Sequence, residues 1–296
     1  MGQKIKNEFS GVNLDQIDAA ISKLCELGTS PTLIEDEVIV SLTSFPERIN
    51  EVHYAIYSLL KQSVKPNKII LWLAEEEFNG KARDLPEALL NLTQYGLEIA
   101  WCSNIGSYKK LLPTLKLHPN AIIVTCDDDA FYANNWLETL LMSHRKHPDL
   151  VIAHRAHQIV FAGDMRLRPY EEWKRCISNI EPSYKNWFTG VGGVLYPPRC
   201  FSEVADVMQD EEIFRFLCPT ADDTWFWTMS ILNDKKIHVA KNNMSNITSI
   251  NLQRALGNTS QFKLSDINVS GNQNIVQIDN ALDFFEIRQK VFRDFY

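Results

Sequence analysis

Residues 121–132 read AIIVTCDDDAFY, and this stretch decides the fold. The apolar run Ala121–Val124 predicts a short buried strand, much too short to span a membrane. The strand leads into Asp127, Asp128 and Asp129, three carboxylates that repel one another and resist desolvation. A bound cation would make this arrangement tolerable. A solvated acidic turn is the plainer interpretation, and the motif alone does not decide between them.

The three acids predict a particular kind of metal site. Alternation along an extended segment places Asp127 and Asp129 on one side and Asp128 on the other. Carboxylate oxygens that converge from one side suit Mg²⁺ or Mn²⁺, which usually keep positions for water and substrate phosphate. We therefore expect Asp127 and Asp129 as metal ligands, with Asp128 beside them in the group that binds the substrate.

Length and composition limit the classes of protein to which this chain can belong. The 296 residues can form one large α/β domain or two smaller ones, and the net charge of −7 argues against nucleic acid as a partner. No apolar run approaches about 18 residues, so we expect no transmembrane helix. The N-terminus lacks the apolar core of a secretory signal. Six scattered cysteines without a C-x-x-C pair predict reduced thiols and a cytoplasmic location.

The first hundred residues alternate between strand and helix patterns. Strands are predicted at Val38–Leu42, Lys68–Leu73 and Leu97–Trp101, with a helix near residues 49–62, which indicates a mainly parallel sheet. Polar residues follow the first strand, where open α/β sheets usually bind ligands; they are Thr43, Ser44, Phe45 and Arg48. No G-x-G-x-x-G or P-loop pattern supports a dinucleotide or P-loop enzyme.

A second group of polar residues follows the third strand. Asn104, Lys109 and Lys110 lie in a glycine- and hydroxyl-containing segment that opens a helix at Leu111–Leu117. Such a segment is a candidate anion site. Two adjacent lysines are also common on ordinary surfaces, so the alternative of a plain surface segment stays open.

The second half is rich in aromatic residues and contains a second acidic pair. Asp222 and Asp223 precede an apolar helix at Thr224–Leu232, where an aspartate is most often a simple N-cap. Glycines in residues 190–193 would let a ligand approach the main chain. Several tryptophans could stack on sugar rings or lie in the core; they are Trp187, Trp225 and Trp227.

Helical segments are expected at both ends of the chain. Asn13 can cap an N-terminal helix that Gly28 ends, and this helix could pack on the domain, on a partner or on a membrane surface. The chain becomes polar and asparagine-rich beyond Ala240, before a C-terminal helix predicted at Asn280–Phe295.

Taken in order, these motifs resemble a bacterial nucleotide-sugar-dependent glycosyltransferase of the GT-A fold, of the family 2-like kind with a D-x-D motif. The resemblance covers Val38 to Ala240 and rests on VSLTSFPERI, GSYKKLLPTL, VTCDDDAFY, VGGVLYPP and ADDTWFW. It implies a transferase domain over residues 36–242, with a nucleotide-binding half (36–132) and an acceptor half (133–242). Residues 1–35 would be a helical extension, and residues 243–296 a polar region with a C-terminal helix.

The resemblance also implies roles for single residues. Asp127 and Asp129 match the D-x-D acids that hold a divalent cation against a sugar nucleotide, here a UDP- or GDP-sugar. Asp223 stands where inverting relatives have the general base, with Asp222 as its neighbour. The sequence departs from the pattern at two places: this pair is Asp-Asp where many relatives have Glu-Asp, and Asn104 stands where some have an acid.

The implied acceptor is a glycan or a lipid-linked glycan in the synthesis of a surface polysaccharide, such as capsule, lipopolysaccharide or exopolysaccharide. Peripheral association with the inner face of the membrane and the oligomeric state stay open. Two rival interpretations remain. Clustered acids and lysines also serve metal-dependent phosphoryl transferases and hydrolases, and the aromatic residues could belong to a carbohydrate-binding module.

Overall fold

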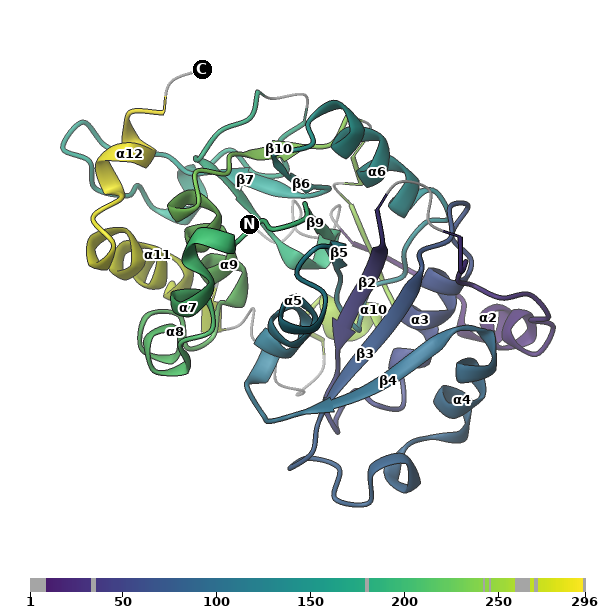
Figure 1. The fold of residues 1–296 in the computed structure, drawn as a ribbon. Coiled ribbons are helices and arrows are strands. Elements are labelled where there is room, and N and C mark those ends of the chain that lie inside the picture. Colours follow the sequence, from purple (N-terminus) through teal and green to yellow (C-terminus); the bar gives the residue numbers. More distant parts are fainter. Residues whose placement is uncertain are drawn as a thin grey trace.

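A seven-stranded sheet lies in the middle of the molecule, with helices on both of its faces (Figure 1). The computed structural model describes residues 9–32, 36–178, 181–241, 243–244, 246–258, 267–268 and 271–294. In spatial order the strands are β10 (Ile237–Val239), β6 (Val151–Ala153), β9 (Val194–Tyr196), β5 (Ile122–Thr125), β2 (Val38–Thr43), β3 (Lys68–Ala74) and β4 (Leu97–Cys102). The described residues thus confirm the predicted α/β domain.

Helices connect the strands and extend beyond them. They are α2 (Leu14–Ile21), α3 (Val52–Leu60), α4 (Glu87–Leu90), α5 (Leu112–Leu117), α6 (Trp136–Lys146), α7 (Ala205–Met208), α8 (Glu211–Leu217), α9 (Asp222–Leu232), α10 (Leu252–Ala255), α11 (Gln273–Phe284) and α12 (Arg288–Phe292). Two predicted helices differ from this. The N-terminal one ends at Ile21 and not at Gly28, and the C-terminal one is divided into α11 and α12.

Both faces of the sheet are buried, because consecutive residues of each central strand enter opposite cores. Ile39 and Ile70 belong to one core, together with residues of α5, α8, α9 and α11. Val40 and Leu71 belong to the other, together with residues of α3 and α6. Strands of a parallel sheet that is covered on both faces are mostly apolar, as the sequences of β2 and β3 show.

The register of the sheet brings distant segments to one edge. β5 is parallel to β2, with Thr125 opposite Ser41, so the residues after both strands emerge on the same side. β9 is antiparallel to β5, with Val194 opposite Thr125, so the turn before β9 reaches that edge as well. The carboxyl edge of a parallel sheet is where ligands bind in open α/β folds.

The N-terminal segment packs on the domain. Tyr54 of α3 donates a hydrogen bond to Asp18 of α2 at 3.2 Å. Gly28 lies against Leu60, where a Cβ would fall 2.6 Å from the backbone of Leu60. Gly28 therefore permits a close approach between segments, and it does not cap the helix.

Part of the expected polar lead-in is ordered as a strand. Residues 9–11 form β1 (Phe9–Gly11), which pairs in parallel with β11 (Ile247–Ser249) far along the chain. Residues 1–8 and 33–35 of the expected N-terminal extension, and Phe295 of the expected C-terminal helix, lie outside the described residues. The division of the chain at residues 35 and 242 stays a prediction.

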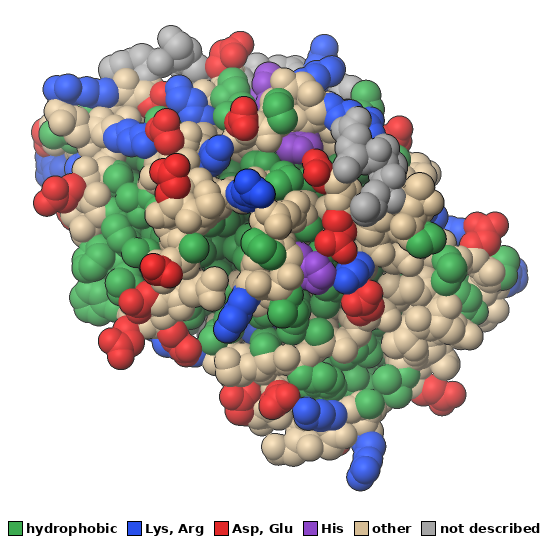
Figure 2. Space-filling view, in the orientation of Figure 1, with side chains coloured by type: hydrophobic (Ala, Val, Ile, Leu, Met, Phe, Trp, Pro, Cys, Tyr) green, Lys and Arg blue, Asp and Glu red, His purple; other side chains and the backbone are tan. Residues whose placement is uncertain are grey.

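Acidic and basic side chains are interspersed over the face shown in Figure 2, and apolar side chains gather over α8 and α11. The exposed apolar residues of these two helices are Phe216, Val276 and Phe284. Among the described residues, no helix is both long and apolar enough to cross a membrane.

Candidate functional site

Two clusters of charged side chains lie at the carboxyl edge of the sheet, one around each basic residue. The first, the Arg48 cluster, consists of Ser44, Arg48, Asp128 and Asp129. Arg48 approaches Oδ1 of Asp128 at 2.7 Å and Oδ2 of Asp129 at 2.8 Å. Ser44 donates to Oδ2 of Asp128 at 2.6 Å, and the guanidinium of Arg48 lies 5.3 Å from the centre of the Phe45 ring.

The second, the Lys110 cluster, joins the two halves of the chain. The Nζ atom of Lys110 lies 2.8 Å from Oδ1 of Asp127, 2.9 Å from Oδ2 of Asp222 and 3.7 Å from Oδ1 of Asp223. The side chain of Lys110 is only 6% exposed. A buried ammonium is costly unless carboxylates surround it, and here three of them do.

The predicted alternation of the three central acids is wrong. Strand β5 ends at Thr125, and the chain then turns through Asp128 and Asp129. In this turn Asp128 and Asp129 both face Arg48, whereas Asp127 faces Lys110. The period of two holds only for extended backbone, so it does not apply past the end of the strand.

The alternative that Asp222 or Asp223 is a simple N-cap is also wrong. Helix α9 begins at Asp222 itself; its N-cap residue is Ala221, and no side chain caps it. Asp222 and Asp223 both approach Lys110, although adjacent helical residues diverge by about 100°. Lys110 forms its hydrogen bond with Asp127, and because Coulomb attraction needs no aligned donor, the same ammonium can pair with both acids of α9.

A backbone group completes the surroundings of Asp223. The N–H of Gly190 donates to Oδ2 of Asp223 at 2.7 Å. A Cβ on Gly190 would lie 2.6 Å from Oδ1 of Asp223 and 2.8 Å from Nζ of Lys110. The glycine that the sequence suggested for close approach of a ligand thus makes room for two side chains of the protein.

Burial and charge shift the acidities at both clusters. Burial raises the pKa of Asp223 to about 7; Lys110 opposes this shift, and Asp222 and Asp127 add to it. Asp223 keeps 23% of its side-chain surface exposed, so an incoming hydroxyl can reach it. A carboxyl group with a pKa near neutrality is suited to general-base chemistry.

The other groups respond to the same forces. Burial raises the pKa of Asp129 to about 6, against the effect of Arg48 and together with that of Asp128 and Asp127. Burial would lower the pKa of Lys110, but Asp127, Asp222 and Asp223 hold it well above its ordinary value. Lys110 is therefore a permanent cation at this site.

Two carboxylates of the acidic turn keep exposed surface, although no group of three or more His, Cys, Asp or Glu side chains among the described residues is arranged to hold a metal ion. Asp127 and Asp129 each keep 28% of their side-chain surface exposed. In each of them one oxygen faces a basic side chain, and the other has no hydrogen bond within the described part of the chain. Asp128 is different, since both of its oxygens are bonded and its side chain is 6% exposed. Hard oxygen donors of this type suit Mg²⁺ or Mn²⁺.

Three predicted residues lie outside the two clusters. Thr43 donates to the carbonyl of Trp72 at 2.8 Å, so it fastens β2 to β3. Lys109 pairs with Glu77 at 3.2 Å, and Asn104 donates to the same carboxylate at 3.0 Å. Lys109 and Asn104 thus form a group of their own around Glu77, a residue that follows β3 and that sequence reasoning missed.

The expected tryptophan platforms belong to the core. Trp187, Trp225 and Trp227 are 3%, 0% and 0% exposed, so none of them offers a face to a sugar. The N–H groups of Trp225 and Trp227 donate to backbone carbonyls. The interpretation as sugar-stacking residues is therefore wrong, and the alternative that they are core residues is confirmed.

Tyr132 is a further residue that sequence reasoning missed. Its hydroxyl accepts from the N–H of Asp127 at 2.9 Å and donates to the carbonyl of Val191 at 3.1 Å. It therefore joins the acidic turn to the segment that holds Asp223. The only signal in the sequence is an aromatic residue three positions after the last acid, which is too common to single out.

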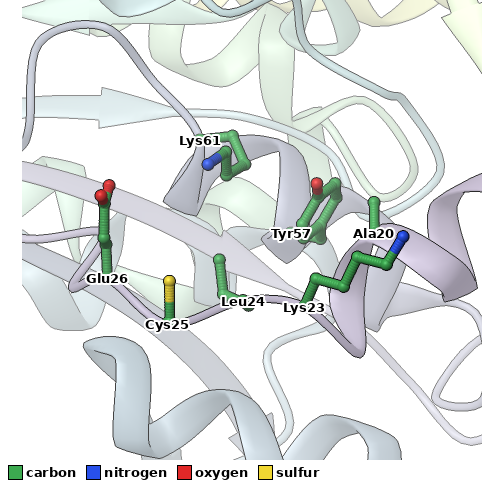
Figure 3. Close-up of a pocket in the computed structure, with 7 residues that line it drawn as sticks. All are labelled: Ala20, Lys23, Leu24, Cys25, Glu26, Tyr57 and Lys61. Atoms are coloured by element: carbon green, nitrogen blue, oxygen red, sulfur yellow. The ribbon is translucent and has the colours of Figure 1, made fainter.

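Two of the cavities formed by the described residues have a volume of about 270 Å³ each. One lies between α2 and α3 and is lined by residues such as Lys23, Tyr57 and Lys61 (Figure 3). The other lies beside the acidic turn and is lined by residues 130–133, among others. Neither is lined by the carboxylates of the two clusters.

Comparison with known proteins identifies no family. No family model matches the chain, and no curated protein matches its sequence. Among solved structures, 241 chains match. One is a CMP:2-keto-3-deoxy-manno-octonic acid synthetase complexed with CTP, with 12% identity and a TM-score of 0.37 over 69% of this chain and 88% of that one. Another is a 4-diphosphocytidyl-2C-methyl-D-erythritol synthase, with 9% identity and a TM-score of 0.43 over 75% of this chain and 96% of that one.

Proposed function

We propose that this protein is a metal-dependent, inverting glycosyltransferase that moves a sugar from a UDP- or GDP-sugar to a hydroxyl group of a glycan or lipid-linked glycan. Surface polysaccharide synthesis is the setting that we infer from the resemblance of the sequence motifs. One observation carries the proposal: Lys110 approaches both Asp127, of the acidic turn, and Asp223, at the start of α9, at 2.8 Å and 3.7 Å.

This geometry supports a division of labour between the acids. Asp127 and Asp129, each partly exposed, would hold the cation, and Asp223 would remove the proton of the attacking hydroxyl. A general base of this kind typically contributes about 10²–10⁴-fold to the rate. A divalent cation, when bound, would offset the negative charge that develops on the departing diphosphate.

The charges of the site support metal dependence. Five aspartates surround two basic side chains, which leaves an excess of three negative charges when all of them are ionised. Arg48 and Lys110 are thus already neutralised by carboxylates of the protein. A diphosphate would be repelled by such a site unless a divalent cation accompanied it.

Two rival functions are distinguished by the products that they form. The proposed transferase releases nucleoside diphosphate from a nucleotide sugar only when a glycan acceptor is present. A phosphoryl transferase or hydrolase releases nucleotide or phosphate without a glycan, and a binding module releases nothing.

The test is a coupled assay of UDP and GDP release, with Mn²⁺, from a panel of UDP- and GDP-sugars. Each donor is incubated with and without glycolipids extracted from a polysaccharide-producing bacterium. We expect release that depends on both the acceptor and the metal. Release that is independent of the acceptor would overturn the proposal.

A further inference from the structure

The cavity beside the acidic turn has an unusual lining for its position. Residues 130–133, Trp136, residues 191–192, residues 243–244 and residues 246–248 enclose about 270 Å³. This volume is near the lower end of the about 300–1,000 Å³ of small-molecule pockets. None of the lining residues is charged, although the pocket adjoins a site with five carboxylates. We call it the neutral pocket.

The lining combines apolar faces with amide and hydroxyl groups. Phe131 and Met244 are partly exposed and supply apolar surface. Asn243, Asn246 and Thr248 supply donors and acceptors from side chains. A sugar ring has the matching character, because its C–H groups form an apolar face and its hydroxyls both donate and accept. An anion is disfavoured, since no described residue of the lining is basic and the neighbouring carboxylates repel it.

The neutral pocket is joined to the base by three consecutive residues. The N–H of Gly190 donates to Asp223, and the next two residues, Val191 and Gly192, line the pocket. Tyr132 forms the second connection, because its ring lines the pocket while its hydroxyl bonds to the backbone of Asp127 and of Val191. The pocket is therefore connected to Asp223 through residues 190–192, and to the acidic turn through Ala130 and Tyr132.

We propose that the neutral pocket is the acceptor subsite and binds an uncharged sugar ring of the acceptor glycan. Its assignment to the acceptor rests on the proposed function, since it follows from the connection of the pocket to the proposed base through residues 190–192. The pocket also replaces the platforms that the buried tryptophans do not provide, with Phe131 as the exposed aromatic side chain.

The test is saturation-transfer difference NMR with methyl glycosides of glucose, galactose, mannose and N-acetylglucosamine, in both anomers. Ala133 lines the pocket and is exposed, so Ala133→Phe fills the pocket at little risk to the fold. Ala133→Ser is the matched control, and Asn246→Ala removes an exposed amide from the rim. Melting temperatures confirm that each variant is folded.

We expect ring-proton signals from at least one glycoside, reduced at least fivefold in Ala133→Phe, reduced in Asn246→Ala and unchanged in Ala133→Ser. Absence of signals from every glycoside, or full signals in Ala133→Phe, would overturn the assignment. Octyl β-glucoside tests the alternative of a lipid chain, because saturation of its chain protons in place of its ring protons would also overturn it.

Binding of UDP and GDP with Mn²⁺, measured on the same proteins, separates the two proposals. Glycoside binding without any nucleotide binding would retain the sugar pocket and overturn the transferase. Nucleotide binding without glycoside binding would overturn the pocket alone. We expect Ala133→Phe to bind nucleotide as the wild type does.

Discussion

The Arg48 cluster and the Lys110 cluster both pair one basic side chain with several aspartates, but they connect different parts of the molecule. Arg48 pairs with two acids of one turn, and its side chain is 18% exposed. Lys110 is only 6% exposed and pairs with acids that are separated by almost a hundred residues of sequence. The first cluster shapes the acidic turn. The second fixes the distance between the turn and α9, so the geometry of any reaction at this edge depends on it.

The largest effect is expected at the exposed carboxylate of the Lys110 cluster. Asp223→Asn removes the proposed base but keeps an oxygen that can accept from the N–H of Gly190. We expect kcat to fall by about 10²–10⁴-fold, with nucleotide affinity and melting temperature close to those of the wild type. On one preparation, steady-state kinetics measures kcat, calorimetry measures nucleotide affinity, and thermal melting measures the melting temperature. Turnover near that of the wild type would contradict the assignment and would favour Asp222 as the base or a retaining mechanism.

Replacement of each of the two neighbouring lysines tests the comparison through the free energy of unfolding. Lys110→Met leaves three buried or partly buried carboxylates without their cation, which we expect to cost about 3–5 kcal/mol in free energy of unfolding. Lys109→Met is the matched control, because Lys109 is also buried but has one carboxylate partner, Glu77. Urea denaturation measures the free energy of unfolding of both variants. Equal losses in the two variants would show that the Lys110 cluster has no special role in joining the halves.

The dependence of rate on pH provides a further test. The base is active when ionised, and the pKa of Asp223 is raised to about 7, so kcat should rise with pH through about 7 and fall about tenfold per unit below it. Stability should change in the opposite direction. A carboxyl whose pKa is raised by folding stabilises the protein fully below its ordinary pKa of about 4. That contribution is lost as the pH rises through about 7. A rate that is flat between pH 5 and 8 would contradict the role of Asp223.

A smaller effect is expected from crowding the Lys110 cluster. Gly190→Ala places a methyl group within 2.8 Å of Asp223 and Lys110, so one of them must move. Overpacking of this kind costs about 1–3 kcal/mol, and we expect a matching loss in kcat/KM. Gly163→Ala is the control, since a Cβ there meets no heavy atom within 4 Å. If both variants retained the activity of the wild type, the fit between Gly190 and Asp223 would be irrelevant to the reaction.

Much of the fold was predictable because it depends on local patterns. Apolar runs gave β2, β3 and β5 within one or two residues, and parallel strands bring Ser44 and the three acids to one edge of the sheet. The alternation of the acids was not predictable, because it assumed extended backbone where the chain turns. The convergence of Asp127 and Asp223 on Lys110 depends on packing between segments far apart in sequence, which no local pattern contains.

The tryptophans illustrate the same limit. Their residue type suits both a sugar platform and a core. The packing of α9 against α11 and the sheet decides between the two for Trp225 and Trp227, and burial of residues 186–188 in the same core decides for Trp187. A similar error concerned Gly190, because its small size was interpreted as room for a ligand. Its neighbours are Asp223 and Lys110, which the sequence could not place beside it.

The central claim is that the acidic turn binds a nucleoside diphosphate through a divalent cation. Isothermal titration calorimetry with UDP and GDP, in Mn²⁺ and in EDTA, on the wild type, Asp127→Asn and Asp129→Asn, tests it most directly. The account predicts binding of at least one nucleotide by the wild type in Mn²⁺ alone, and its loss in both variants at unchanged melting temperature. Equal affinity in EDTA, or full binding by both variants, would contradict the claim.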